Sequence, residues 1–168
     1  MPKKSLKKAF VEYCLKEKFE KNREQIKILD TLYSFHQKKK FLLDIFNKSS
    51  NKMGFYLHGE VGVGKTMILN FFFEKLNEKK LRLHFNEFMI QFHDFIFKVK
   101  DKENGIEYFV KDLSKKAEVV YFDEFQVTNI DDAMILVRLF KRIFEEKIKV
   151  IFSSNIKIND LYKDGLQR

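Results

Sequence analysis

The sequence predicts an α/β fold in which a parallel sheet is flanked by helices. Short apolar runs alternate along the chain with longer segments whose apolar residues recur at helical spacing. Three of the runs end in glycines, carboxylates or small polar residues, as strands do at the ligand-binding edge of open α/β sheets. Strands that alternate with helices pair in parallel through right-handed crossovers. The 168 residues are enough for one such domain.

The first predicted strand covers residues 55–58, and a glycine-rich loop follows it. The loop reads Gly59-Glu-Val-Gly-Val-Gly-Lys-Thr66 and matches G-x-x-x-x-G-K-[ST] in full, and residues 67–76 are expected to form a helix. Glycine lets backbone N–H groups turn inward and approach phosphate oxygens, which a β-carbon obstructs. Strand, loop and helix in this order is the context that a P-loop requires, so the sequence predicts a nucleotide site.

Each residue of this loop has an expected role. Lys65 offers a positive charge to the β and γ phosphates, and the Thr66 hydroxyl is expected to bind Mg²⁺. The helix that starts there presents its positive N-terminal end to the anion. ATP and Mg²⁺ are therefore the expected cofactors. The predicted nucleotide-binding residues are Gly59, Glu60, Val61, Gly62, Val63, Gly64, Lys65, Thr66 and Met67.

A second apolar run, residues 118–122, ends in Asp123 and Glu124, which is the pattern of a Walker B strand. Asp123 is suited to hold Mg²⁺, directly or through water, opposite Thr66. Because side chains alternate along a strand, Glu124 should point differently and could orient or deprotonate the attacking water. Acidic pairs at strand ends are also common on solvated surfaces. The position after the P-loop favours the hydrolytic interpretation.

A third apolar run ends in small polar residues and reads Lys149-Val-Ile-Phe-Ser-Ser-Asn155. In P-loop ATPases with an extra strand between the P-loop strand and the Walker B strand, that extra strand ends beside the γ-phosphate. Asn155 is then expected to help Glu124 position water, as a sensor. An ordinary asparagine in the turn after a strand is the alternative interpretation.

The remaining segments complete the alternation of strand and helix. Residues 81–85 predict a strand, and residues 87–99 and 106–116 predict helices. A helix over residues 131–146 is apolar on more than one face and is expected to be largely buried. The segment before residue 51 is expected to be helical and to pack against the sheet. This divides the chain into an extension over residues 1–50 and a core domain over residues 51–168. The apolar residues at helical spacing in the extension are Ile26, Leu29, Leu32, Tyr33, Phe41, Leu42, Ile45 and Phe46.

Several segments together resemble the successive signatures of the AFG-like AAA+ ATPases, a family with bacterial and mitochondrial members. The resemblance runs from about residue 20 to the last residue. Its most specific parts are Phe122-Asp-Glu-Phe-Gln-Val-Thr128 and Asp160-Leu-Tyr-Lys-Asp-Gly-Leu-Gln-Arg168. Two positions depart from the family pattern: Glu60 stands where glycine is usual, and Asn86 stands where histidine is frequent.

The resemblance implies an AAA+ type of P-loop fold and Mg²⁺-dependent ATP hydrolysis. It assigns hydrolytic roles to Lys65, Asp123 and Glu124, and the sensor role to Asn155. Arg168, or an arginine just beyond it, is expected to act as a finger that reaches a neighbouring subunit's γ-phosphate. Homo-oligomerisation and coupling to a protein partner, in bacteria the division machinery, are implied as well. Because an AAA+ module continues with another strand and a helical lid, we expect the C-terminal lid to be missing and the core to be incomplete.

Two other functions stay open on the sequence. One is a nucleic-acid-associated AAA+ factor of the helicase-loader type, and the other is an inactive nucleotide-binding fragment. The net charge of +9 is compatible with a polyanionic partner, but only five of the 33 basic residues are arginine and no basic helix face stands out. Drift in an AT-rich genome explains this composition better. The segment from Asp123 to Thr128 also argues against the loader.

The expected location is the cytoplasm. The single cysteine, Cys14, cannot form an internal disulfide, which suits a reducing compartment. The first residues include Lys3, Lys4, Lys7 and Lys8, but no apolar stretch follows them, so neither a signal peptide nor a spanning helix is expected.

Overall fold

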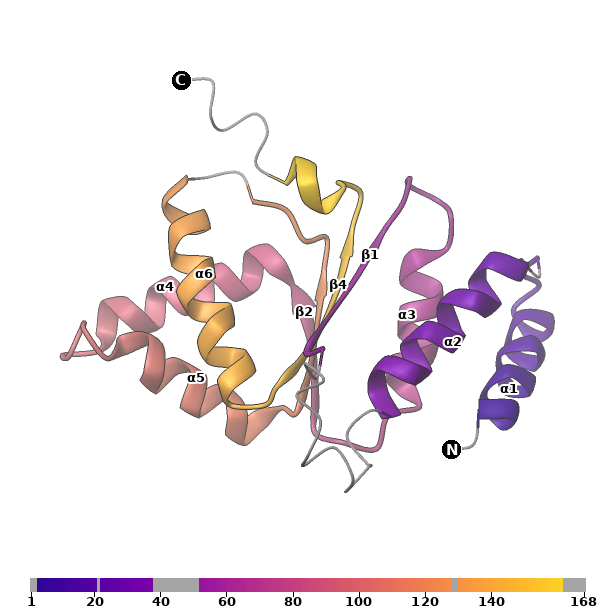
Figure 1. The fold of residues 1–168 in the computed structure, drawn as a ribbon, viewed down its shortest axis with the longest axis horizontal. Helices are drawn as coiled ribbons and strands as arrows, with labels where there is room; N and C mark the ends of the chain where they lie inside the picture. Colours follow the sequence, from indigo (N-terminus) through magenta and orange to yellow (C-terminus); the bar gives the residue numbers. More distant parts are fainter. Residues whose placement is uncertain (1–2, 21, 38–51, 128–129, 162–168) are drawn as a thin grey trace. The chain divides into compact units, whose positions relative to one another are not determined.

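The computed structural model describes residues 3–20, 22–37, 52–127 and 130–161 (Figure 1). The chain divides into two compact units. One contains α1 (Lys3–Lys16), α2 (Arg23–Gln37) and all of α3 (Lys65–Glu74) except its first residue. The other contains the sheet, the P-loop and the remaining helices. The boundary predicted near residue 50 stays a prediction.

The helices of the N-terminal unit are joined by aromatic contacts and by charge. The ring of Phe71 on α3 lies 5.0 Å from that of Phe10 and 5.2 Å from that of Tyr13, both on α1. Lys7 of α1 pairs with Asp30 of α2 at 2.7 Å.

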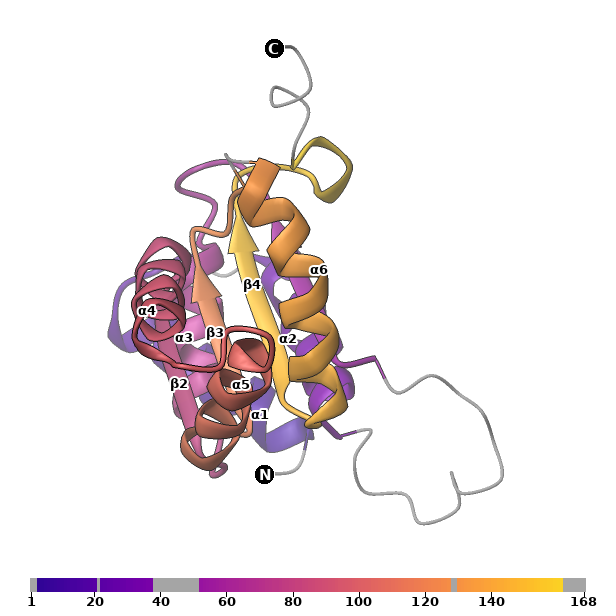
Figure 2. The same ribbon diagram turned by 90° about the vertical axis from the view of Figure 1, so that its left-hand side faces the viewer.

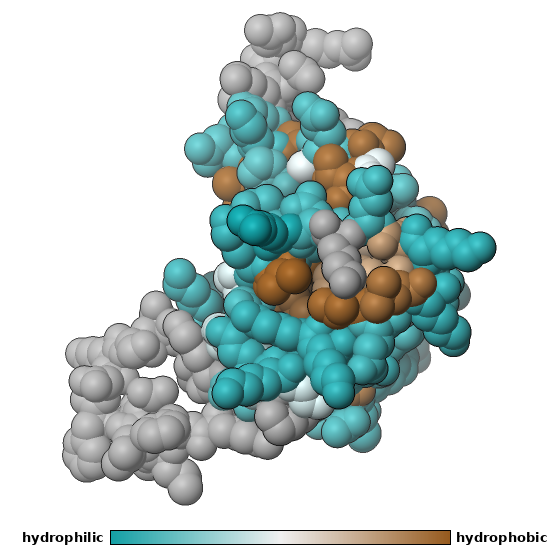
Figure 3. Space-filling view, turned by 90° about the vertical axis from the view of Figure 1, so that its right-hand side faces the viewer, coloured by the Kyte–Doolittle hydropathy of each residue, from teal (hydrophilic) through white to brown (hydrophobic). Residues whose placement is uncertain are grey.

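On the face drawn in Figure 3, hydrophilic residues surround a central group of hydrophobic ones. None of the described helices combines the length and the apolar character that crossing a bilayer requires.

Four parallel strands form the sheet in the described part of the chain. Their spatial order is β1 (Gly54–His58), β4 (Lys149–Ser154), β3 (Val119–Asp123) and β2 (Lys80–His84). The strand that ends before Asn155 thus lies between the P-loop strand and the Walker B strand, which confirms the predicted order. Every residue of β3 and β4 is buried, as their apolar runs predict. The register places His84 beside Asp123 and His58 beside Ser154, so the candidate residues follow strand ends at one edge of the sheet.

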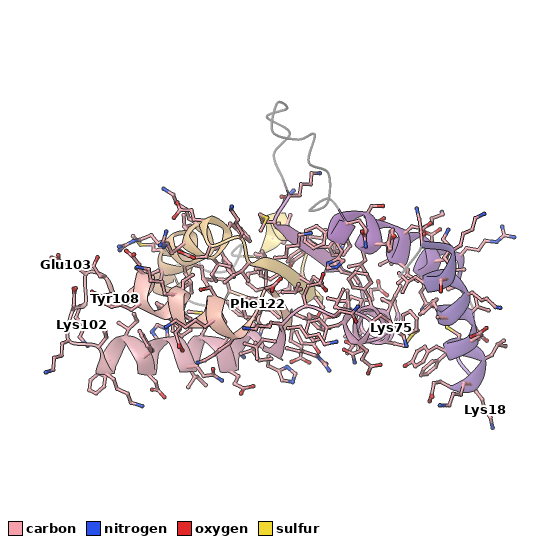
Figure 4. The ribbon with its side chains drawn as sticks, turned by 90° about the horizontal axis from the view of Figure 1, so that it is seen from below. Lys18, Lys75, Lys102, Glu103, Tyr108 and Phe122 are labelled. Carbon is pink, nitrogen blue, oxygen red and sulfur yellow. The ribbon has the colours of Figure 1, made fainter. Side chains whose placement is uncertain are left out.

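One face of this sheet is covered by α4 (Phe85–Lys98), α5 (Gly105–Lys116) and α6 (Ile130–Glu145), as Figures 1 and 2 show. Phe122 of β3 lies at the centre of the core, with ring centroids 4.5 Å from Phe88 and 5.7 Å from Phe85 and Phe152. Figure 4 shows Phe122 among the side chains in the middle of this unit and Lys102 at its outer end. Burial of this aromatic cluster fixes the helices on the sheet.

The prediction that the last helix is largely buried is wrong. Met134 and Val137 of α6 are 70% and 73% exposed, whereas Leu136, Leu139 and Ile143 are buried. The buried residues recur at spacings of three and four and form one stripe toward the core, so the exposed pair lies on another face. The helix is therefore amphipathic, and two of its apolar residues face solvent.

Most element boundaries lie within two residues of the predicted ones. The helix predicted from residue 87 begins at Phe85, which the sequence assigned to the preceding strand, because the backbone leaves the extended conformation after His84. The helix predicted from Met67 begins at Lys65. The strand predicted to end at residue 122 includes Asp123. The predicted helical segment around residues 41–46 lies outside the described residues.

Candidate nucleotide-binding site

The loop between β1 and α3 owes its shape to two glycines. Gly62 and Gly64 have φ angles of +84° and +83°, a left-handed region that costs other residues about 1–2 kcal/mol. A Cβ at Gly62 would have no neighbour within 4 Å, so the requirement there is conformational and not steric. Glu60, by contrast, has no positive φ, so its backbone does not require glycine.

Lys65 connects this loop to the end of β4. Its Nζ donates to the carbonyl oxygens of Gly59 and Glu60, both at 2.7 Å, and to Oδ1 of Asn155 at 2.8 Å. The Gly59 N–H also donates to the Ser154 carbonyl at 3.3 Å. The structure therefore brings together the predicted lysine and the predicted sensor. An ammonium group has three N–H donors, so a phosphate that binds Lys65 replaces one of these oxygens.

Asp123 lies at the end of β3, is only 6% exposed and accepts three hydrogen bonds. The hydroxyls of Ser153 and Tyr121 donate to Oδ1, the latter at 3.1 Å, and Arg82 Nη2 donates to Oδ2 at 2.7 Å. Burial alone would raise the pKa of Asp123, but the hydrogen bonds from Ser153, Arg82 and Tyr121 lower it more. The net pKa lies below the ordinary value, so the carboxylate is ionised at neutral pH.

This shift predicts that Asp123 stabilises the fold less in acid. A carboxyl group whose pKa is lower in the folded than in the unfolded chain stabilises the folded state above the unfolded value, about 3.9, and loses that effect as the pH falls through the folded value. We expect Asp123→Asn to lower the free energy of unfolding more at pH 7 than at pH 3. Urea titrations of both proteins at the two pH values measure the difference. An equal loss at both values would contradict it.

Tyr121 completes the surroundings of Asp123. It is fully buried, and burial raises its pKa to about 12, so its hydroxyl remains a donor at neutral pH. The Arg82 guanidinium lies over its ring, 5.2 Å from the centroid. Sequence reasoning missed Arg82, Tyr121 and Ser153. A signal existed for Tyr121, because it precedes Asp123 by two residues on the same strand and therefore shares its face.

Glu124 differs from Asp123 in both backbone and exposure. Its φ is +54°, its side chain is 75% exposed, and its N–H donates to Ser153 Oγ at 3.3 Å. The two carboxylates thus occupy different environments, but Glu124 follows the end of β3 with a left-handed backbone, so strand alternation is not the cause. Oε2 of Glu124 lies 3.6 Å from Nδ1 of His84, an ion pair whenever the histidine is protonated. A left-handed backbone at a non-glycine residue is a form of strain that concentrates at functional sites.

The backbone at residue 124 leads to a stability prediction. Alanine in the left-handed region costs about 1–2 kcal/mol more than glycine does, whereas both substitutions remove the same exposed side chain. We therefore expect Glu124→Gly to unfold at a higher denaturant concentration than Glu124→Ala, by about 1 kcal/mol in free energy. At Lys102 the φ is not positive, so there the glycine variant should unfold at a lower denaturant concentration than the alanine variant. Equal stability of the Glu124 pair would mean that the turn relaxes.

Three predicted residues stay untested by this geometry. Thr66 and Met67 belong to the unit of α1, α2 and α3, so their positions relative to Asp123 remain predictions. Arg168 lies outside the described residues, and its role as a finger remains a prediction as well.

The oxygen donors at this site fit a metal that arrives with a nucleotide. Among the described residues, no group of three or more histidine, cysteine, aspartate or glutamate side chains could hold a metal ion by itself. Mg²⁺ in nucleotide sites is held by one or two carboxylates together with phosphate oxygens and water. The ionised carboxylate of Asp123 meets this requirement, and the loop supplies a cation and glycine backbone for the phosphates.

The fold resembles that of a domain of a replication initiation protein. Domain III of the replication initiation protein DnaA from Thermotoga maritima aligns with a TM-score of 0.59 at 16% identity, over 86% of this chain and 57% of that one. At this identity the likeness concerns the fold alone. Together with the parallel sheet and flanking helices, it identifies a P-loop fold of the AAA+ type.

Sequence comparison gives the family. The Cell division protein ZapE of Escherichia coli K12 is 38% identical over 116 residues, which are 68% of this chain and 31% of that protein. Lactation elevated protein 1 homolog B of Danio rerio is 37% identical over 134 residues, which are 73% of this chain and 27% of that protein. The chain thus spans less than a third of the length of these relatives. The model of the AFG1-like ATPase family matches residues 7–168, and the chain belongs to this family.

Proposed function

We propose that this chain binds ATP with Mg²⁺ at the loop that ends in Lys65 and hydrolyses it. The observation that supports this most is the bond from Lys65 Nζ to Asn155 Oδ1, because it joins the P-loop cation to the end of the strand beside the Walker B strand. A γ-phosphate bound by Lys65 would lie within reach of both elements. The match to an ATPase family agrees with this function.

Each candidate residue has a role in this proposal. Lys65 and the backbone N–H groups of the loop bind the phosphates, and Asp123 supplies a fixed negative charge for the metal. Mg²⁺, when bound with ATP, neutralises negative charge on the β and γ phosphates. Glu124 is exposed and ionisable, so it can orient the attacking water and accept its proton. Asn155 helps to place that water.

Calorimetric titration with ATP and Mg²⁺ tests the binding step. We expect one ATP to bind each chain, with a lower affinity when EDTA removes the metal. Lys100→Ala, an exposed lysine after α4, is the matched control and should bind like the unchanged protein. The absence of binding heat in a folded protein, with and without Mg²⁺, would contradict the proposal.

Replacing Asn155 should separate binding from hydrolysis. In Asn155→Ala, Lys65 loses one of its three acceptors but keeps its charge and the carbonyls of the loop. We expect ATP affinity to change by less than about threefold, whereas turnover falls by about 10–100-fold because water positioning is lost. Calorimetry and phosphate release on the same preparations measure the two effects. A proportional loss of both would assign Asn155 to binding alone.

We further propose that hydrolysis acts on a protein partner and requires more than one copy of the chain. For the partner, the support is the likeness to ZapE, whose name describes it as a cell division protein. The requirement for more than one copy is what the resemblance to AAA+ ATPases implies. If the chain is bacterial, proteins of the division machinery are the first partners to test. Crosslinking of the chain in the presence of ATP, compared with Lys65→Ala, measures whether self-association depends on the nucleotide.

A further inference from the structure

Arg82 donates a hydrogen bond to Oδ2 of the Walker B carboxylate. Oδ1 of Asp123 accepts from Tyr121 and Ser153, both buried, whereas Oδ2 accepts from Arg82 at 2.7 Å. The Arg82 side chain is 38% exposed and that of Asp123 only 8%. Of the three donors, Arg82 is therefore the one that reaches solvent.

The arginine is also held in place by a second contact. Its guanidinium lies 5.2 Å from the centroid of the buried Tyr121 ring, and Tyr121 itself donates to Asp123. Two independent contacts restrict its rotation more than one ion pair on an open surface would.

We propose that the Arg82 guanidinium competes with the metal for Oδ2 of Asp123. Asp123 would then act on Mg²⁺ through water, and Arg82 would set the affinity of the site for the metal. This inference rests on the function proposed above. A carboxylate has about four acceptor positions, of which three are used here, and a direct metal bond at Oδ2 would place a divalent cation beside the guanidinium. A water molecule between the metal and the carboxylate would separate the two positive charges.

The proposal gives Arg82 an effect that an ordinary structural ion pair would lack. Loss of a structural pair would lower stability and weaken the metal site or leave it unchanged. Loss of a competing positive charge strengthens metal binding. Repulsion between a guanidinium and a divalent cation, reduced by solvent and salt, corresponds to about three- to tenfold in metal affinity.

Binding of Mn²⁺ in the presence of ADP tests this, with free Mn²⁺ measured by electron paramagnetic resonance. We expect Arg82→Gln to bind Mn²⁺ about three- to tenfold more tightly than the unchanged protein, and Arg82→Lys, which keeps the charge, to bind within about twofold of it. Affinity for ADP in EDTA should stay the same in all three. Arg82→Met retains the stem that packs on Tyr121 and replaces Arg82→Gln if that variant does not fold.

Two controls show whether the effect passes through Asp123. In the background of Asp123→Asn, Arg82→Gln should bring a smaller gain in Mn²⁺ affinity than in the unchanged protein, because only the repulsion between the guanidinium and the metal is relieved and no carboxylate is released. Arg142→Gln removes an arginine that pairs with Glu107, Glu145 and Glu146 around α6, and it should leave Mn²⁺ affinity unchanged. Equal or weaker Mn²⁺ binding by Arg82→Gln would overturn the inference and leave the proposed function intact. Absence of Mn²⁺ and ADP binding in the unchanged protein would instead overturn the proposed function.

Discussion

Replacement of Lys65 by alanine should weaken ATP binding by about 10–100-fold and turnover by at least about 100-fold. A hydrogen bond between charged groups stabilises a complex by about 1.5–3 kcal/mol, and the ammonium also neutralises phosphate charge as the transition state forms. Part of this gain is offset, because Lys65 gives up bonds to Gly59, Glu60 or Asn155 when it takes a phosphate. Calorimetry and phosphate release measure the two losses.

The same variant should keep its fold. Lys65 lies at the start of α3, and the oxygens that it leaves can bind water. We expect its thermal unfolding midpoint to lie within a few degrees of that of Lys100→Ala, which retains binding. If Lys65→Ala bound ATP as tightly as Lys100→Ala, the nucleotide would have to bind elsewhere in the chain.

Replacement of Glu124 by glutamine should lower turnover but, unlike Lys65→Ala, leave ATP affinity nearly unchanged. The amide is nearly the same size and removes only the charge and the basic oxygen, so ATP affinity should stay within about threefold. Turnover should fall by about 100- to 10,000-fold, the range that a positioned general base contributes. Phosphate release in a single turnover, with ATP bound before Mg²⁺ is added, measures the chemical step.

A control distinguishes the loss of a base from the loss of structure at this turn. The Glu124 side chain is 75% exposed, so Glu124→Gln should not change the unfolding midpoint. Glu124→Asp keeps the charge but shortens the side chain and should retain more turnover than Glu124→Gln. If Glu124→Gln hydrolysed ATP at the normal rate, another group would have to activate the water.

The features that the sequence predicted well are local. The glycines of the loop and the apolar runs of β3 and β4 depend on neighbouring residues, and periodicity detects such patterns. The exposure of Met134 and Val137 was missed because an apolar residue count per helix does not say which face meets the core.

The contacts of Asp123 could not be predicted in the same way. Arg82 and Ser153 come from strands 41 and 30 residues away in sequence, and their approach depends on sheet order and register. A one-residue shift of β2 would turn Arg82 to the other face of the sheet. Only the position of Tyr121, on the same strand and face as Asp123, contained a local signal.

The measurement that tests the central claim most directly is Mg²⁺-dependent phosphate release from ATP at increasing protein concentration, with Glu124→Gln as the background. We predict release above that background, rising more steeply than in proportion to concentration because neighbouring copies assist one another, and abolished in Lys65→Ala. Binding of ATP with no release above the Glu124→Gln background at any concentration would contradict hydrolysis by this chain.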